Sequence, residues 1–118
     1  MAKVRDLMTK HIVGVSNDTS VDSARRLMNS MHVEIIPVLS DGKLSGIVVD
    51  SDLKDIEGAE KVGTVMRRPI FVEEDADAKN AAKKMVDNAF GRIPVVNNSK
   101  DMHCVGVINS TDVVKSLK

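Results

Sequence analysis

Two short polar segments carry the side chains best suited to chemistry, and each follows an apolar run. Ser51-Asp52 comes after Gly46-Ile47-Val48, and Thr111-Asp112 comes after Gly106-Val107-Ile108. An aspartate carboxylate can accept hydrogen bonds from two vicinal hydroxyl groups, and the neighbouring hydroxyl can donate to a phosphate. Ser, Thr and Asp are also the preferred residues at helix starts. The residues therefore fit either a sugar-phosphate contact or a helix cap, and their recurrence in one context favours the ligand role.

Basic side chains near these segments could contact an anion. Arg92 stands beside Gly91, immediately before an apolar run. It fits either a phosphate contact or a solvated arginine at a strand edge. The adjacent pair Arg67-Arg68 fits surface charge in a loop, with a ligand contact as its alternative. Arg92 is therefore the candidate phosphate contact, with the solvated arginine as its alternative.

Three histidines and one cysteine are the residues that could bind a transition metal. The positions of His11, His32, His103 and Cys104 match no zinc-ligand spacing. Cys104 begins an apolar run, where an inert core thiol is expected. The sequence also lacks nucleophile-elbow, zinc-protease and phosphate-loop signatures. We expect no metal site, no catalytic cofactor and no enzymatic activity.

The composition of the chain argues against nucleic acids and membranes as partners. Lys and Arg together number 17, as do Asp and Glu, so the net charge is zero, whereas non-specific nucleic-acid binding needs a basic surface. Phe71 and Phe90 are the two aromatic residues, too few for a base-stacking surface. No apolar run approaches the roughly 18 residues of a membrane span, and the opening MAKVRDLMTK lacks the apolar core of a secretory signal. With a single cysteine, a cytoplasmic protein is expected.

The candidate residues lie in two copies of one sequence unit. Five landmarks recur in the same order, at an offset that drifts only from 57 to 60 residues. Such a repeat defines the architecture of a chain. The matched pairs are Val4–Met8 with Val62–Met66, Ala24 and Met28 with Ala81 and Met85, Ile36–Val38 with Ile93–Val95, Gly46–Val48 with Gly106–Ile108, and Ser51-Asp52 with Thr111-Asp112.

Each copy is predicted to fold as β-α-β-β-α, which gives an α/β (α+β) fold class. The Asp41-Gly42 pair between two apolar runs predicts a tight hairpin. A unit of about 60 residues buries little surface alone, so the copies, residues 1–57 and 58–118, are expected to form one compact module. The first copy has a predicted strand at 12–15, a helix from Thr19/Ser20 to Met31, strands at 35–39 and 44–49, and a helix starting at Ser51-Asp52. The second has a strand at 70–72, a helix from 78 to 90, strands at 93–96 and 104–108, and a helix starting at Thr111-Asp112.

Glycines and prolines inside the predicted strands indicate special backbone geometry. Gly46 and Gly106 allow close approach of a ligand or another backbone, or else mark bulges. Pro37 and Pro94 indicate an edge strand or the start of a strand.

The ordered landmarks, present in duplicate, resemble a tandem pair of CBS domains, named after cystathionine β-synthase. The resemblance covers nearly the whole chain and rests on Met8, Ala24, Ile36-Pro37-Val38, Asp41-Gly42, Gly46-Ile47-Val48 and Asp52-Leu53 with their downstream repeats. It implies a pseudo-two-fold packing of the copies. It also implies a non-catalytic regulatory module that senses AMP, ADP, ATP or S-adenosylmethionine in a cleft between the repeats. A regulated protein, unknown here, would read the change. A homodimer is expected through the helices starting at Asp52 and Asp112.

Carried over residue by residue, the resemblance implies two sites. The first has Thr9, Ile12, Val13, Val33, Glu34 and Ile35 around the base, Val107, Asn109, Thr111 and Asp112 on the ribose side, and Arg92 near the phosphate. The second has Arg68, Pro69, Ile70, Phe90 and Gly91 around the base, with Ile47, Val49, Ser51 and Asp52 opposite.

Both copies depart from the family pattern at the first Ser/Thr of the ribose segment. Val49 stands there in the first copy and cannot hydrogen-bond, whereas Asn109 in the second copy can. Arg92 aligns with Ile35, so only the first site receives a basic residue from this position. The site built on Asp112 is therefore expected to be the stronger. The departures also support an alternative, an oligomerisation or protein-interaction scaffold with a vestigial cleft.

Overall fold

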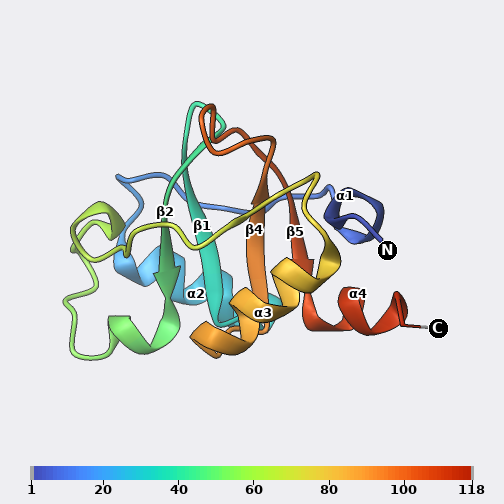
Figure 1. Ribbon diagram of the computed structural model, residues 1–118. Helices are drawn as coiled ribbons and strands as arrows, with labels where there is room; N and C mark the ends of the chain where they lie inside the picture. The colour runs from blue at the N-terminus through green and yellow to red at the C-terminus, as the bar shows by residue number, and fades with distance from the viewer. Residues whose placement is uncertain (1, 118) are drawn as a thin grey trace. The chain divides into compact units, whose positions relative to one another are not determined.

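The computed structural model describes residues 2–117, which fall into two compact units (Figure 1). The continuous unit is Val13–Pro69. The discontinuous unit joins the residues up to Ile12 to those from Ile70 onward. Both combine helices with a small sheet, and the α+β fold class is confirmed.

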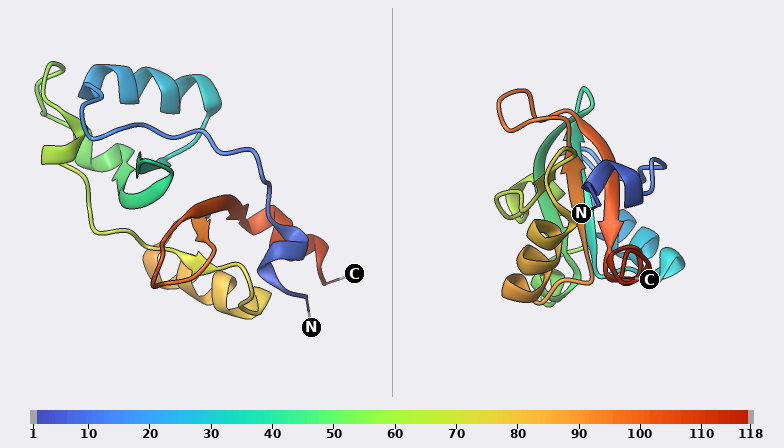
Figure 2. Two further views of the ribbon diagram at one scale, coloured as in Figure 1. Left: turned by 90° about the horizontal axis from the view of Figure 1, so that it is seen from above. Right: turned by 45° about the vertical axis from the view of Figure 1, so that its right-hand side comes forward.

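The continuous unit places one helix on a hairpin. Helix α2 (Val21–Met31) precedes β1 (Ile35–Ser40) and β2 (Lys43–Val49), which pair antiparallel, and two 3-10 turns follow, η1 (Asp50–Leu53) and η2 (Val62–Thr64). Figure 2 shows α2 lying to one side of the hairpin. The apolar face of α2 and the inner faces of the strands form the core. Its members include Val21, Ala24, Met28, Ile36, Val38, Val48, Leu53 and Val62.

The discontinuous unit contains a three-stranded sheet in the order β3-β4-β5. Its elements are α1 (Val4–Leu7), β3 (Val72–Glu73), α3 (Ala78–Asn88), β4 (Arg92–Val96), β5 (Cys104–Asn109) and α4 (Ser110–Lys115). Strand β3 runs parallel to β4, and β5 antiparallel to it. Helix α3 packs against β3, β4 and α4. The core includes Val4, Val72, Ala81, Met85, Ile93, Val95 and Ile108.

The turn between β1 and β2 has the predicted form. Asp41 and Gly42 both have positive φ, 52° and 81°, as a two-residue hairpin loop of the right twist requires. Helix α2 also begins as predicted, because the Ser20 hydroxyl accepts a hydrogen bond from the Ser23 amide at 3.1 Å. Local sequence therefore determines both features.

Each unit is completed by the opening segment of the other sequence copy. In the continuous unit the Val62 amide donates to the Thr19 carbonyl at 2.8 Å, although residue 62 opens the second copy. In the discontinuous unit the Val4 amide donates to the Ala76 carbonyl at 2.9 Å. The copies thus exchange their first segments: the residues up to Ile12 belong to the unit of the second copy, and residues 58–69 belong to the unit of the first copy. The repeat boundary at 57/58 stays a prediction, since the units group the chain by contact and not by copy.

The exchanged segments explain Gly46 and Gly106. A Cβ atom on Gly106 would lie 2.7 Å from the Thr9 carbonyl oxygen, and one on Gly46 would lie 2.8 Å from that of Arg67. No real Cβ atom comes that close to an oxygen without a shift of the neighbour. Close approach by another backbone is therefore observed. The bulge alternative is observed too, because the pairing register of each hairpin shifts just beside the glycine.

The prolines occupy strand positions whose N–H side needs no partner. The Pro37 carbonyl accepts from the Val15 amide at 3.0 Å, so the Pro37 nitrogen faces the same side and away from β2. Pro94 lies in β4 just before the two residues that pair with β3. Both positions tolerate a missing donor. The expectation of an edge strand or a strand start is nevertheless wrong for Pro94, because it lies in the middle of β4, the central strand of its sheet.

Four predicted elements are wrong in extent or type. Residues 12–15 form no strand and make only one isolated bridge, between Val15 and Val38, while the strand predicted at 70–72 is limited to Val72–Glu73. The helix predicted from Ser51-Asp52 is the four-residue 3-10 turn η1. Helix α3 ends at Asn88, because Ala89 is left-handed with φ 57°, so Phe90 lies beyond it.

Candidate functional site

The end of β5 positions the polar residues of the Asp112 segment. Asn109 is the N-cap of α4, and its side-chain oxygen accepts from the Asp112 amide at 2.8 Å. In return, Asp112 Oδ2 accepts from the Asn109 amide at 3.0 Å. This reciprocal pair is a capping box. The predicted helix start at Thr111-Asp112 is therefore corrected by one residue, since α4 begins at Ser110.

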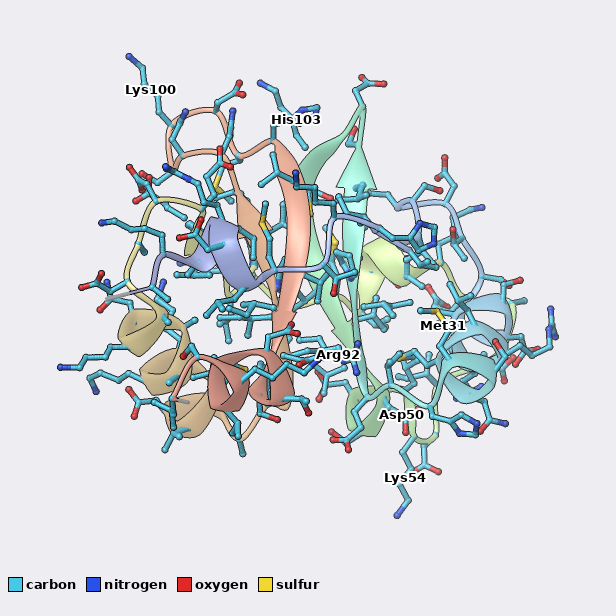
Figure 3. The ribbon with its side chains drawn as sticks, turned by 90° about the vertical axis from the view of Figure 1, so that its right-hand side faces the viewer. Met31, Asp50, Lys54, Arg92, Lys100 and His103 are labelled. Atoms are coloured by element: carbon cyan, nitrogen blue, oxygen red, sulfur yellow. The ribbon has the colours of Figure 1, made fainter. Side chains whose placement is uncertain are left out.

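The same end of the sheet gathers other predicted site residues of the discontinuous unit. Arg92 faces Asn109 in the β4–β5 register, and Figure 3 shows Arg92 at the start of its strand. Thr9 and Val107 form a bridge through two backbone hydrogen bonds of 2.8 and 2.9 Å. Thr111 is exposed on the first turn of α4, and Ile12 ends the exchanged segment. Gly91 joins them, because its carbonyl accepts from the Ser110 amide at 2.9 Å.

In the continuous unit, the predicted base-side residues lie where β1 begins. Ile35 pairs with Val49 across the hairpin, and the Glu34 carbonyl accepts from the Asp50 amide at 2.8 Å. Val33 is buried in the core, and Val13 precedes the bridge at Val15. Glu34 and Asp50 are exposed at the same end of the hairpin. The structure thus brings the two strand ends together.

Asp52 is held by an arginine of the exchanged segment. Arg67 Nε donates to Asp52 Oδ2 at 2.5 Å, and Arg67 Nη2 donates to Asp52 Oδ1 at 2.7 Å. The hydrogen bonds from Arg67, with the attraction of its guanidinium, lower the pKa of Asp52 from its ordinary value, against the opposing effect of burial. Asp52 also raises the pKa of Arg67. Both oxygens of this candidate ribose ligand are engaged within the unit.

The remaining residues of the second site are split between the units. Ile47 forms a backbone bridge with Arg67, and Ser51, Arg68 and Pro69 lie nearby along the chain in the continuous unit. Ile70 and Phe90 belong to the discontinuous unit, where both pack against its core. The first site is divided as well, since Val13, Val33, Glu34 and Ile35 stand apart by unit from Asp112. The assembly of either full set into one site stays a prediction.

Sequence reasoning missed two features of these segments. Arg67 is the partner of Asp52 and not only a surface charge. The repeat alignment carries the signal for it, because Arg67 occupies the place of Thr9. Asn109 is a helix cap as well as a candidate ligand contact, and its position just before a helix is the signal for a cap.

Neither a metal cluster nor a reactive thiol is seen in the described residues. Across 2–117, no three His, Cys, Asp or Glu side chains come together as a metal site. Burial raises the pKa of the Cys104 thiol, which is 5 % exposed, so an inert core residue is what the structure shows. Within that range, no helix has the length and apolar character needed to cross a membrane.

Pockets lie beside both long helices. One of about 280 Å³ in the continuous unit is lined by Arg25, Arg26, Asn29, His32, Val33 and Asp50, among others. Another of about 340 Å³ lies between α3 and β3 and is lined by Phe71, Glu73, Lys83 and Lys84, among others. Val33 alone among these residues belongs to a predicted site.

Comparison with known sequences identifies the repeat. The family model described as CBS domain matches residues 4–57 and again 62–118. An uncharacterized protein of Methanocaldococcus jannaschii is 32 % identical over 117 residues, covering 97 % of this chain and 43 % of that protein. Inosine-5′-monophosphate dehydrogenase of Thermoplasma acidophilum is 31 % identical over 116 residues, covering 98 % of this chain and 22 % of the enzyme. The chain spans less than half the length of these two curated relatives.

Solved structures share the fold. The crystal structure of CBSX2 in complex with AMP is 27 % identical, has a TM-score of 0.84, and is matched over 99 % of this chain and 96 % of that one. A CBS domain pair crystallised with 5′-methylthioadenosine and S-adenosyl-L-methionine has a TM-score of 0.81 at 22 % identity, over 99 % and 96 % of the chains. The chain belongs to the CBS-domain family, and its two CBS domains account for nearly all of its length.

Proposed function

We propose that this chain is a non-catalytic regulatory module that binds an adenosine nucleotide or a related adenosyl ligand between its two repeats. The observation that carries the proposal is the full-length match to a CBS-domain protein crystallised with AMP. AMP, ADP, ATP and S-adenosylmethionine are the candidate ligands. The dehydrogenase activity of the longer relative is not extended to this chain, because the match covers 22 % of that enzyme.

The site built on Asp112 is proposed as the stronger one. A carboxylate has about four acceptor positions, and the capping box uses Oδ2 once. Cap and ribose contact are therefore compatible on one side chain. Arg92, opposite Asn109 in the sheet register, supplies a positive charge beside the same segment. Thr9, Val107 and Thr111 complete this side of the site, and Val33, Glu34 and Ile35 are proposed to contact the base.

The proposed output is a change in the preference between two arrangements of the module. A ligand shifts such an equilibrium only by the difference of its affinities for the two states. A partner protein that contacts one arrangement better would then respond to the ligand. The regulated partner and a cytoplasmic location belong to this proposal.

Titration calorimetry tests the proposal. AMP, ADP, ATP and S-adenosylmethionine are titrated into the wild-type chain, into Asp112→Ala and into a matched control, Asp6→Ala. The control is apt because Asp6 fills the corresponding capping position of α1, where its Oδ2 accepts from the Lys3 amide at 3.3 Å. We expect sub-millimolar binding, weakened about tenfold by loss of a charge-assisted contact in Asp112→Ala and unchanged in Asp6→Ala. Absence of heat with every ligand would refute the proposal.

A protein-interaction scaffold is the second candidate. Three large apolar side chains are exposed on α3 and α4 or just after α4, namely Val86 (79 %), Val114 (58 %) and Leu117 (79 %). Exposed apolar side chains that lie together favour an interface, and Val114 and Leu117 are only three positions apart in the chain. A homodimer through α4 is proposed on this basis, whereas the second dimer helix expected at Asp52 is only the turn η1. A partner protein that co-purifies with a ligand-free chain would favour the scaffold over the ligand sensor. Light scattering that reports a monomer at high concentration would contradict the homodimer.

A further inference from the structure

The backbone around β2 positions both residues of the Arg67–Asp52 pair. Arg67 lies in the exchanged segment, where its amide donates to the Ile47 carbonyl at 2.9 Å and its carbonyl accepts from the Ile47 amide at 3.1 Å. Asp52 lies in η1, directly after β2. The strand that carries Ile47 therefore fixes the start of both side chains. The bidentate contact is a feature of the fold of this unit and not a chance encounter of two mobile loops.

The equivalent position in the discontinuous unit has no basic side chain. Thr9 bridges Val107 as Arg67 bridges Ile47. A threonine cannot form a guanidinium–carboxylate pair, and Asp112 is engaged instead by the Asn109 amide. The two candidate ribose ligands thus differ in what a ligand must displace. At Asp112 it shares the carboxylate with a cap, whereas at Asp52 it competes with a guanidinium for both oxygens.

We propose that Arg67 is a specificity-determining residue of the Asp52 site, which withholds the carboxylate from neutral nucleosides and yields it to ligands that carry a phosphate. The inference rests on the proposed function, because it takes Asp52 as a ribose acceptor. A guanidinium binds phosphate in the same bidentate manner as carboxylate. A nucleotide can therefore offer Arg67 a new anion while its ribose takes Asp52. A neutral nucleoside also occupies Asp52, but it offers Arg67 no anion in place of the lost carboxylate.

The expected size of the effect follows from the exposure of the pair. The side chains are 46 % exposed for Arg67 and 31 % for Asp52. Solvent-exposed pairs contribute up to about 1 kcal/mol, which corresponds to about fivefold in affinity. Removing Arg67 should therefore tighten binding of adenosine two- to fivefold. It should weaken binding of AMP, because a phosphate contact is lost.

The experiment isolates the Asp52 site in an Asp112→Ala chain. Dissociation constants for adenosine and AMP are measured by calorimetry with and without Arg67→Thr, which installs the residue found in the other unit. The preference for AMP over adenosine should fall about tenfold. Arg26→Thr is the matched control, since Arg26 is an exposed arginine of α2 in the same unit. It should leave both constants unchanged. Thermal unfolding of each variant verifies that it is folded.

Other results overturn the inference in distinguishable ways. Equal changes for adenosine and AMP, or no tightening of adenosine, would show that Arg67 does not select for charge, and the proposed function would stand. An Asp112→Ala chain that binds neither ligand, beside a wild type that binds AMP, would show that Asp52 builds no site. A wild-type chain that binds neither ligand would remove the proposed function together with this inference.

Discussion

The segment after β5 and the segment after β2 start from equivalent positions of the repeat and end differently. After β5, Asn109 caps a six-residue α-helix. After β2, Val49 offers no side-chain cap, and the chain makes only a 3-10 turn of four residues. The aspartates three residues later also differ, because Asp112 closes a capping box whereas Asp52 pairs with Arg67. The roles of the repeated aspartates therefore differ where two neighbouring positions differ, namely the residue at the strand end and the residue that bridges the strand.

Substitution of the glycine that both units share should have the largest effect on stability. Gly46→Ala and Gly106→Ala both place a Cβ under 3 Å from a backbone oxygen of the exchanged segment. Each should lower the free energy of unfolding by about 1–3 kcal/mol, as overpacking does. Urea unfolding measures the loss. Gly91→Ala is the control, because a Cβ there meets nothing within 4 Å. A marked difference between the two glycine variants would show that the exchange is tight in one unit only.

The cap should give a smaller, one-sided effect. Asn109→Ala removes the side-chain acceptor of the Asp112 amide and should cost about 1 kcal/mol. Val49→Asn places the same residue at the other strand end, and it should lengthen the helical turn after β2 only if capping is what η1 lacks. Amide chemical shifts of residues 50–56 and 110–116 report both changes. An α4 that persists in Asn109→Ala would assign the difference between the units to packing and not to the cap.

The ion pair should give the smallest effect. A double-mutant cycle of Asp52→Asn and Arg67→Gln should yield a coupling of about 0.2–1 kcal/mol at pH 7, as expected for an exposed pair. The pKa of Asp52 is lowered in the folded chain, so the folded state favours its ionised form. The coupling should therefore be complete above the ordinary carboxyl pKa and vanish as the pH falls through the lowered one. A coupling that stays constant down to that pH would contradict the pairing.

Sequence predicted the parts of this fold that depend on local signals. The Asp41-Gly42 turn, the Ser20 cap and the four long strands follow from residue type and periodicity, and the structure has them. The repeat likewise placed Asp52 and Asp112 at equivalent strand ends. The Arg67–Asp52 pair was not predicted, because it joins residues 15 positions apart through the exchange of segments and the repeat alignment gives only the place of Arg67. The strand predicted at residues 12–15 is wrong because local pattern was not sufficient there. Its β-branched side chains match the strand pattern, but only Val15 forms a bridge, with Val38.

The exchange of opening segments has a consequence for how the chain can be divided. A cut between the sequence copies would leave residues 1–57 without the segment around Val62 that closes their core. Residues 13–69 carry both sides of those contacts in one uninterrupted stretch. The natural fragment for expression is therefore offset from the repeat by about a dozen residues. The other half would have to be rebuilt by linking its two ends, so a circularly permuted chain would present each unit as a contiguous piece.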